Sequence, residues 1–581
     1  MIKKLLKCVR EYKKPAILAP LIIAGEVAIE CFIPFVTAEL VRNIESGCEL
    51  SVIVKYGLIL ILLAVASLTC GALAGHFAAI AGCGFAKNVR HDAYCKIQQY
   101  SFSNMDKFST AGLVTRLTTD VSYVQMAFMM IIRTAIRAPM MIVFALVMAI
   151  SISPKMSLAF AVVVPILGVG LWLIFKYAHP IFKTVFKKYD NLNNSVQENV
   201  SGMRVVKSFV REDYERKKFE KASDEVADGF TRAEKILALN SPIMQFCFNA
   251  LMLMVCFFGS QLIIKSNQTE LDIAGFSALL TYGAQILMSL MMLSMIIVMI
   301  TLSAESASRL AEILGEESAI QNPAHPVTEV LDGSILFDKV SFSYSDTAEK
   351  SSLSDINLFI ASGETVGIVG GTGSGKTSMV QLISRLYDVT DGTVKVGGVD
   401  VRDYDIETLR NEVSVVLQKN VLFSGTIKDN LRWGDKNATD EEMVRICKLA
   451  QAHDFIESFP DKYDTQITQG GTNVSGGQKQ RLCIARALLK KPKILILDDS
   501  TSAVDTKTDA LIRRAFAEEI PNTTKIIIAQ RISSVEHADK IIVLDGGKIE
   551  SVGNHEELLS KSPIYKEIYD SQTKGAQEDE E

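Results

Sequence analysis

The sequence lacks three features that would each indicate a common class of protein. Its ten cysteines are scattered and form no CxxC pair, so neither a zinc site nor a disulfide framework is predicted. Its formal net charge of −5 gives no indication of a nucleic-acid-binding protein. No small-residue cleavage site follows the basic segment 1–14 and its apolar continuation, so we do not expect a cleavable signal.

Apolar runs of membrane length are also missing from the second half of the chain. The 581 residues are too many for one hydrophobic core, so at least two domains are expected. Mean hydropathy is high at +0.22, although 22% of the residues are charged. Because the apolar runs are confined to residues 15–305, we predict a membrane half followed by a soluble half.

Six segments of the first half are apolar enough to cross a bilayer, which takes about 20 residues. The basic N-terminus is expected in the cytoplasm by the positive-inside rule, and six crossings return the chain there. We therefore expect a multi-pass protein of the cell (plasma or inner) membrane, in contact with lipid, whose soluble half is cytoplasmic. The predicted spans are 15–38, 52–83, 125–152, 155–180, 238–265 and 272–302.

The predicted inner connections are much longer than the outer ones. They cover residues 87–126 and 179–237, and structureless connections of such length are uncommon. We predict that the membrane helices continue well into the cytoplasm. The alternative is that these segments are solvated loops.

The soluble half contains a complete phosphate-binding loop. The predicted strand 364–369 leads into GxxxxGK followed by Thr, and a helix begins at Lys376. Glycines let backbone N–H groups approach phosphates, and a helix N-terminus favours anions. Lys376 supplies positive charge, and the Thr377 hydroxyl can ligate magnesium. The loop consists of Gly370, Gly371, Thr372, Gly373, Ser374, Gly375, Lys376 and Thr377.

A second glycine pair precedes a predicted helix, and two acidic residues follow a predicted buried strand. The glycines belong to the sequence Ser475, Gly476, Gly477 and Gln478, where backbone donors can again meet an anion. The strand 494–497 ends in Asp498 and Asp499, at the edge where α/β folds bind ligands. One carboxylate there can hold magnesium, and the next can orient a nucleophilic water.

These motifs, in this order, resemble those of the ABC (ATP-binding cassette) ATPases. The resemblance implies an α/β P-loop ATPase domain with a helical subdomain that binds ATP and Mg²⁺. It assigns Tyr344 to stacking on adenine and Gln530 to the switch position. It assigns Thr377, Gln418 and Asp498 to the metal, and adds Ser378, Gln418 and Asp505 of the D-loop (500–505) to the nucleotide contacts.

The membrane half resembles the six-span, α-helical domain of exporter-type ABC proteins, so the chain is expected to be a half-transporter. Segments 109–121 and 201–209 resemble the coupling segments of that family. The division implied is a transmembrane domain at 1–310, a linker at 311–333, a nucleotide-binding domain at 334–573 and an acidic tail at 574–581.

Two residues depart from the family pattern. Asp499 stands where the family has the catalytic Glu, and Gln530 stands where it has the switch His. The Asp carboxylate retracts by about 1 Å, a misplacement that can cost roughly a hundredfold in rate. Gln can hydrogen-bond a phosphate oxygen but cannot exchange a proton near neutral pH. We predict that these two catalytic positions make a site that binds ATP but hydrolyses it slowly. The alternative is neutral drift in a fully active enzyme.

The family's two cassettes close head to tail, so the signature at Ser475–Gln478 is expected to complete the site of a partner chain. A homodimer would carry two slow sites. We therefore predict a heterodimer with a second half-transporter that has the usual Glu and His, while a homodimer remains possible.

Four ionisable residues inside predicted spans are candidate substrate residues. Glu26 and Glu30 lie in the first span, and Arg133 and Arg137 lie in the third. Each pair has i,i+4 spacing and so shares one helix face. Intramembrane charges usually face a cavity or one another. The four residues therefore either pair for structure, with the arginines able to reach the inner interface, or form an acidic patch that attracts cationic amphipathic compounds.

Spans three and six are rich in methionine, which suits promiscuous apolar surfaces but also packs against lipid. The sequence favours an ATP-driven exporter of small hydrophobic or amphipathic compounds, as in multidrug export. A lipid or peptide exporter with the same ATPase, and a nucleotide-sensing regulatory subunit, remain as alternatives.

Overall fold

The computed structural model describes residues 2–345, 351–500 and 504–578. The chain forms two compact units. The helical unit comprises Met1–Gln98 and Thr110–Glu316, and the sheet unit comprises Gln99–Ser109 and Glu317–Glu581.

The helical unit confirms the six predicted spans. Among the described residues, six helical stretches are long and apolar enough to cross a membrane. The elements of the unit are α1 Ile2–Lys7, η1 Arg10–Tyr12, α2 Lys13–Glu45, α3 Leu50–Gln98, α5 Thr110–Thr115, the π-helix η2 Arg116–Asp120, α6 Val121–Ile152, α7 Pro154–Ser201, α8 Met203–Ser208, α9 Glu212–Leu237, α10 Asn240–Ser266 and α11 Ile273–Gly315.

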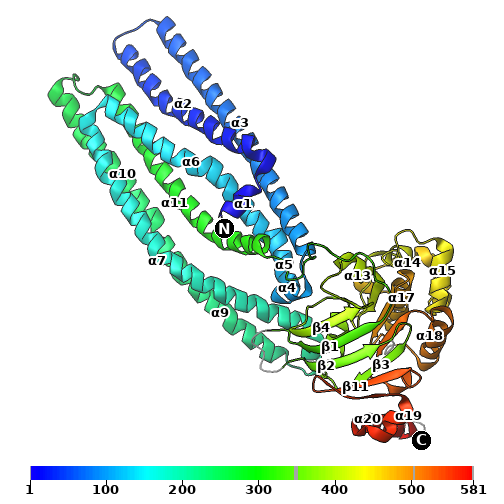
Figure 1. The fold of residues 1–581 in the computed structure, drawn as a ribbon. Helices are drawn as coiled ribbons and strands as arrows, with labels where there is room; N and C mark the ends of the chain where they lie inside the picture. The colour runs from blue at the N-terminus through cyan, green and yellow to red at the C-terminus, as the bar shows by residue number, and fades with distance from the viewer. Residues whose placement is uncertain (1, 346–350, 501–503, 579–581) are drawn as a thin grey trace. The chain divides into compact units, whose positions relative to one another are not determined.

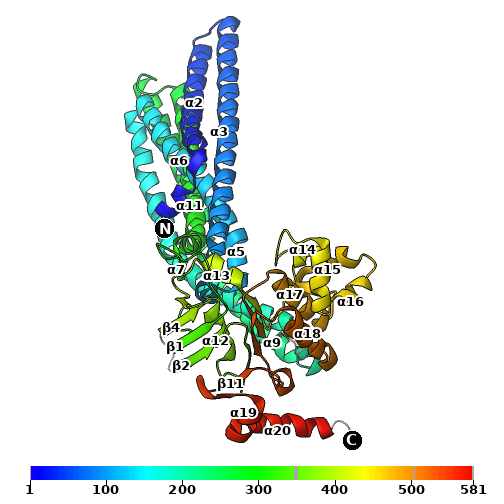
Figure 2. The same cartoon turned by 45° about the vertical axis from the view of Figure 1, so that its right-hand side comes forward.

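The long inner connections are helical, as predicted. Helix α3 has 49 residues and α7 has 48, more than twice the number that a bilayer requires. In both views α2 and α3 run side by side, as the close packing of the two helices also indicates (Figures 1 and 2). The solvated-loop alternative is therefore wrong for most of residues 87–126 and 179–237.

Local chemistry sets where these helices begin and what joins them. Pro154 occupies the first turn of α7, where its missing N–H costs nothing. The Asp272 side chain caps α11 by accepting the Gly275 N–H at 2.9 Å, and it also bonds Arg42 of α2 at 2.7 Å. Deeper in the unit, the buried Tyr282 hydroxyl donates to the Cys31 carbonyl at 2.7 Å. These contacts tie α11 to α2 at two levels.

In its described residues, the sheet unit contains three sheets surrounded by short helices. Its strands are β1 Ile335–Phe342, β2 Leu353–Ile360, β3 Thr365–Gly370, β4 Asp391–Val396, β5 Val399–Asp400, β6 Val413–Val416, β7 Gly425–Thr426, β8 Gln466–Ile467, β9 Ile494–Asp498, β10 Thr524–Ile528, β11 Lys540–Asp545 and β12 Lys548–Gly553. Its helices are α4 Phe102–Lys107, α12 Lys376–Ile383, α13 Ile406–Glu412, α14 Ile427–Leu431, α15 Asp440–Leu449, α16 His453–Glu457, η3 Lys462–Asp464, η4 Gln469–Gly471, α17 Gly476–Leu489, α18 Thr506–Glu519, η5 Ile532–Ser534, α19 His555–Lys561 and α20 Pro563–Glu578.

The main sheet has the order β12-β11-β3-β10-β9-β6, and its strands are parallel except for β12. The register pairs Ile528 of β10 with Ile368 of β3 and with Asp498 of β9. The carboxyl ends of β3, β9 and β10 therefore meet at one edge of the sheet. The P-loop follows β3, and Asp499 follows β9. The loop that carries Gln530, called the switch loop below, follows β10.

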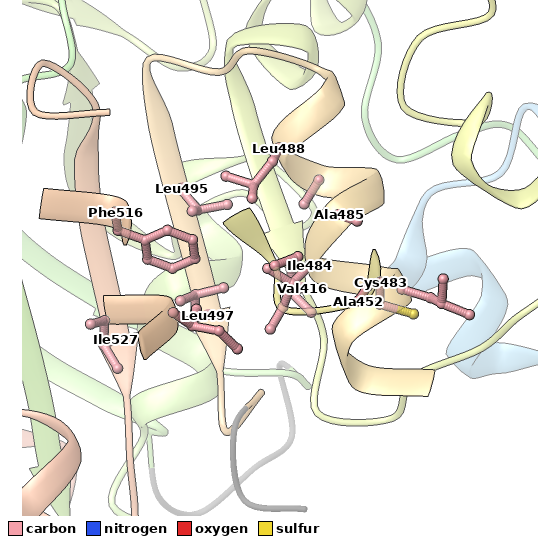
Figure 3. Close-up of a cluster of buried hydrophobic side chains, with 14 of the residues drawn as sticks. Val416, Ala452, Cys483, Ile484, Ala485, Leu488, Leu495, Leu497, Phe516 and Ile527 are labelled. Carbon is pink, nitrogen blue, oxygen red and sulfur yellow. The ribbon is translucent and has the colours of Figure 1, made fainter. Parts of the chain in front are cut away.

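A buried apolar cluster fixes α17 against this sheet. Figure 3 shows side chains of α17, among them Ile484 and Leu488, directed toward Leu495 and Leu497 of β9. Strand β9 is buried along its whole length, which explains the unbroken apolar run of residues 494–497. Phe516 of α18 joins the same cluster. The helix that carries the predicted signature is thereby held to the strand that carries the predicted carboxylates.

Helix α4 belongs to the sheet unit although it lies between two membrane helices in the sequence. The Tyr387 hydroxyl donates to Asp106 at 2.7 Å, and Asn104 bonds both Glu317 and Ala319 at 3.0 Å. The predicted coupling segment 109–121 begins where this contact ends, and its residues from Thr110 onward belong to the helical unit. The second segment, 201–209, includes α8. The coupling role of both segments remains a prediction.

Candidate nucleotide-binding site

The P-loop joins β3 to α12, as predicted, and its backbone favours glycine at three positions. Gly370 has φ 151°, Gly373 has φ 79° and Gly375 has φ 97°, values that side chains rarely adopt. A Cβ at Gly370 would overlap the Leu544 carbonyl oxygen of the neighbouring strand β11. By contrast, a Cβ at Gly371 would meet no atom within 4 Å.

Gly370→Ala should lower the free energy of unfolding by about 2–3 kcal/mol, because overpacking and backbone strain coincide there. The matched variant Gly371→Ala should unfold close to the wild-type temperature. Thermal unfolding of the purified, nucleotide-free chain measures both. Equal unfolding temperatures for the two variants would show that the loop does not require a glycine at position 370.

Lys376 lies over the loop that precedes it. Its ammonium group donates to the carbonyls of Gly370 at 2.9 Å and Gly371 at 2.7 Å. Burial lowers the pKa of Lys376, and the negative charges of Asp498 and Asp499 oppose this effect. A phosphate group would supply the negative charge that the half-buried ammonium favours.

Thr377 and Asp498 form a pair suited to Mg²⁺. The Thr377 hydroxyl donates to Asp498 Oδ1 at 3.3 Å, and Asp498 is 2% exposed. Burial raises the pKa of Asp498, and the neighbouring Asp499 adds to the shift. A hydroxyl and a carboxylate side by side fit a cation that prefers oxygen ligands and completes its shell with water and phosphate. When Mg²⁺ is bound, it would neutralise phosphate charge, with Thr377 and Asp498 as its protein ligands and Gln418 as a further candidate.

The two residues that depart from the family pattern contact each other. Gln530 Nε2 donates to Asp499 Oδ2 at 2.9 Å, and Gln418 Nε2 approaches the same oxygen at 3.5 Å. Burial raises the pKa of Asp499, whereas these amides and Lys376 favour its charged form. The Asp499 backbone has φ 49°, a left-handed conformation that Asp tolerates better than most residues. The predicted catalytic positions are therefore brought together at the end of β9.

Tyr344 and Ser378 lie together at the P-loop helix. The Tyr344 hydroxyl bonds the Ser378 hydroxyl at 2.9 Å and Gln381 at 3.1 Å. The tyrosine is 50% exposed, so part of its ring is open to a ligand. Its stacking on adenine remains a prediction.

The signature begins a helix, as predicted. Ser475 caps α17 by accepting the Gln478 N–H at 3.2 Å, and the Gln478 side chain accepts the Ser475 N–H at 2.9 Å. Within the described residues, no hydrogen bond or ion pair joins Ser475–Gln478 to the P-loop. Asp505 caps α18 through the Thr508 N–H at 2.9 Å, while D-loop residues 501–503 lie outside the described part of the chain.

Sequence reasoning missed two glutamines that contact these segments. Gln480 of α17 is 3% exposed and donates to the Asp499 carbonyl at 3.3 Å. Gln572 of α20 bonds the backbone on either side of Arg531. Gln480 could have been identified from the sequence, because it is a polar residue on the buried face of α17. No local pattern indicated Gln572, because its partners lie about 40 residues away in the chain.

The structure joins three of the four candidate substrate residues. The Arg137 guanidinium bonds Glu26, and it bonds both oxygens of Glu30 at 2.8 and 2.7 Å. Gly71 of α3 leaves room for this cluster, since a Cβ there would lie 3.1 Å from Glu26 Oε1. Arg133 is exposed and has no ion pair among the residues that the structure describes. The geometry agrees with pairing for structure at Glu26, Glu30 and Arg137.

Comparisons with known proteins cover nearly the whole chain. Residues 16–307 match the model of the ABC transporter transmembrane region, and residues 353–502 match the ABC transporter model. The uncharacterized ABC transporter ATP-binding protein YfiB of Bacillus subtilis is 34% identical over 98% of both chains. The ATP-dependent lipid A-core flippase of Desulfotalea psychrophila is 32% identical over 84% of this chain and 85% of its own. A solved bacterial Atm1-family ABC exporter with ATP bound has the same fold, with a TM-score of 0.83, 23% identity and coverage of 97% and 98%.

Proposed function

The chain belongs to the ABC transporter family as a membrane domain fused to an ATP-binding cassette, and on this premise we propose that it is one half of a heterodimeric exporter whose own ATP site turns over slowly. It has the exporter-type fold and the six membrane helices of a half-transporter, and its cassette binds ATP with Mg²⁺. Half-transporters of this family act as dimers. The cassette is proposed to lie on the cytoplasmic side of the plasma or inner membrane.

The contact between Gln530 and Asp499 supports the slow site. Asp499 is shorter than the usual glutamate, so its carboxylate reaches about 1 Å less far from the end of β9, where the 2.9 Å bond from Gln530 orients it. A carboxylate with this shorter reach is poorly placed to orient a water at the terminal phosphate. Gln530 bonds through a neutral amide, so it cannot relay a proton as a histidine can. ATP binding is left intact, because the P-loop and the pair Thr377–Asp498 keep the residues it requires.

The intact signature supports a partner chain. The capping bonds of Ser475 and Gln478 keep the N-terminus of α17 in a form that can receive an anion. The partner's phosphates would meet this surface, and the partner's own Glu and His would carry out hydrolysis there. ATP binding would then close the two cassettes, and hydrolysis in the partner's site would reset them.

Small hydrophobic or amphipathic molecules are the proposed substrates. Met288, Met292 and Met295 of α11 are 60%, 45% and 64% exposed in the single chain, and flexible thioethers adapt to varied apolar ligands. A lipid substrate is the second candidate, because a relative of this chain is named as a lipid A-core flippase. Substrate-stimulated ATPase measured with the two classes would separate these candidates.

ATPase activity of the purified chain, alone and co-purified with a half-transporter that has Glu and His at the two positions, tests the proposal. We expect turnover alone to be at least about a hundredfold slower than turnover of the pair. Brisk, substrate-stimulated turnover of the chain alone would contradict the slow site and indicate a homodimeric pump. Turnover of the pair without any substrate stimulation or transport would favour a nucleotide-sensing regulatory subunit.

A further inference from the structure

The C-terminal helix α20 is firmly anchored to the sheet unit. Tyr565 is fully buried in the same apolar cluster as Ile532 of the switch loop and Ile541 and Val543 of β11. The Tyr565 hydroxyl lies 2.7 Å from His555 Nδ1, and the Ser562 hydroxyl, just before α20, donates to Glu550 at 2.7 Å. Side chains on α20 therefore have a defined position relative to the main sheet.

One exposed side chain of this helix holds the switch loop at two points. Gln572 Oε1 accepts the Ile532 N–H at 2.9 Å, and Gln572 Nε2 donates to the Gln530 carbonyl at 2.7 Å. The amide thus spans Arg531 and closes a ring with the loop backbone. A carboxamide suits this arrangement, because the same side chain must both donate and accept.

The ring adjoins the hydrogen bond between Gln530 and Asp499, the two proposed hydrolytic positions. The backbone of Gln530 is held by Gln572, and the side chain of Gln530 holds Asp499 at 2.9 Å. Other hydrogen bonds hold the residues around Gln530: the Ala529 N–H donates to the Ile368 carbonyl at 3.3 Å, Arg513 donates to the Ser533 carbonyl at 2.7 Å and Ser534 donates to Asp509 at 3.2 Å. Among the described residues, the backbone carbonyl of Gln530 itself is bonded by Gln572.

We infer that Gln572 is a positioning residue for ATP hydrolysis, which acts through the switch loop by holding Gln530 against Asp499. This inference rests on the proposed role of Asp499 and Gln530 as the hydrolytic positions. Gln530 contacts Asp499 through one neutral hydrogen bond from its side-chain amide. A shift of the Gln530 backbone would therefore move this amide away from Asp499. The hydrogen bonds of Gln572 go to Ile532 and to the Gln530 carbonyl rather than to the P-loop, so its removal should leave ATP binding intact.

The test uses the full-length chain in lipid nanodiscs and two measurements. Hydrogen exchange of a peptide covering residues 528–535 measures how well the amides of the switch loop are protected. Single-turnover hydrolysis of labelled ATP measures the rate of the hydrolysis step, even when steady-state turnover is slow. In Gln572→Ala, the loop peptide should gain about one deuteron at early times. Its hydrolysis rate should fall about tenfold with an unchanged KM for ATP, since even small misplacements of reacting groups are costly.

Two further variants make the result specific. Ser571→Ala removes a hydrogen bond within α20, from the Ser571 hydroxyl to the Ile568 carbonyl at 2.8 Å, and should leave both measurements unchanged. Gln572→Glu keeps an acceptor for Ile532 but has no donor for Gln530, so it should protect the Ile532 amide and still slow hydrolysis. If Gln572→Glu hydrolyses ATP at the wild-type rate, the bond to Gln530 has no catalytic role and the inference fails.

The remaining outcomes are equally decisive. Unchanged exchange or an unchanged rate in Gln572→Ala overturns the positioning role. A rise in exchange across the whole sheet unit, or a rise in KM that matches the loss of rate, assigns Gln572 to general stability and also overturns it. Fast hydrolysis by the wild-type chain would contradict the slow site alone, because the ratio between variant and wild type still reports on Gln572.

Discussion

Replacing Asp499 with Glu and Gln530 with His in the same chain should raise its ATP hydrolysis rate by about a hundredfold. The longer side chain moves the carboxylate outward by about 1 Å, and a misplacement of this size costs roughly that factor. The imidazole adds a group that can exchange protons near neutral pH. Steady-state ATPase of the purified chain measures the gain.

The single variants should each recover much less than the double variant. The two side chains are in direct contact at 2.9 Å, and the effects of residues that act as a unit are not additive. Asp499→Glu should also lower the free energy of unfolding by about 1 kcal/mol, because Glu tolerates a left-handed backbone less well than Asp. Asp405→Glu, which lengthens the carboxylate that caps α13, is the matched control and should not accelerate hydrolysis. A double variant as slow as the wild type would refute the slow-site proposal.

Replacing Arg137 with Met should lower the free energy of unfolding of the membrane helices by about 3–5 kcal/mol. The change leaves Glu26 and Glu30 without their counterion, and an uncompensated buried charge has a cost of that size. Glu26 is only 7% exposed, so water cannot replace the guanidinium. Thermal unfolding of the purified chain in detergent measures the loss.

Two controls separate the loss of charge pairing from the loss of packing. Arg133→Met lies one helical turn away on the same helix, at an exposed position, and should cost less than about 1 kcal/mol. The triple variant Glu26→Gln, Glu30→Gln and Arg137→Met removes all three charges and should recover most of the stability. If Arg137→Met unfolds at the same temperature as Arg133→Met, the cluster has no structural role, and an acidic patch for cationic substrates becomes the better interpretation.

The nucleotide site was readable in the sequence because its chemistry is local. A P-loop needs its glycines, lysine and threonine within eight consecutive positions, and the strand before it and the helix after it follow from the same short segment. The six spans were readable for a similar reason, since each is a continuous apolar run whose length the bilayer dictates. The residues that depart from the family pattern, Asp499 and Gln530, were visible by comparison with its motifs.

The sequence by itself determined the family, the six spans and which residues are predicted to bind ATP and Mg²⁺. Only the tertiary structure decided which distant residues meet: Gln530 with Asp499, Gln572 with the switch loop, Arg137 with both glutamates, and α4 with the sheet unit. Periodicity and short motifs report the chemistry of neighbours in the chain. Contacts between residues far apart in the sequence depend on how parallel strands align and how helices pack, and those arrangements leave no mark on a local pattern.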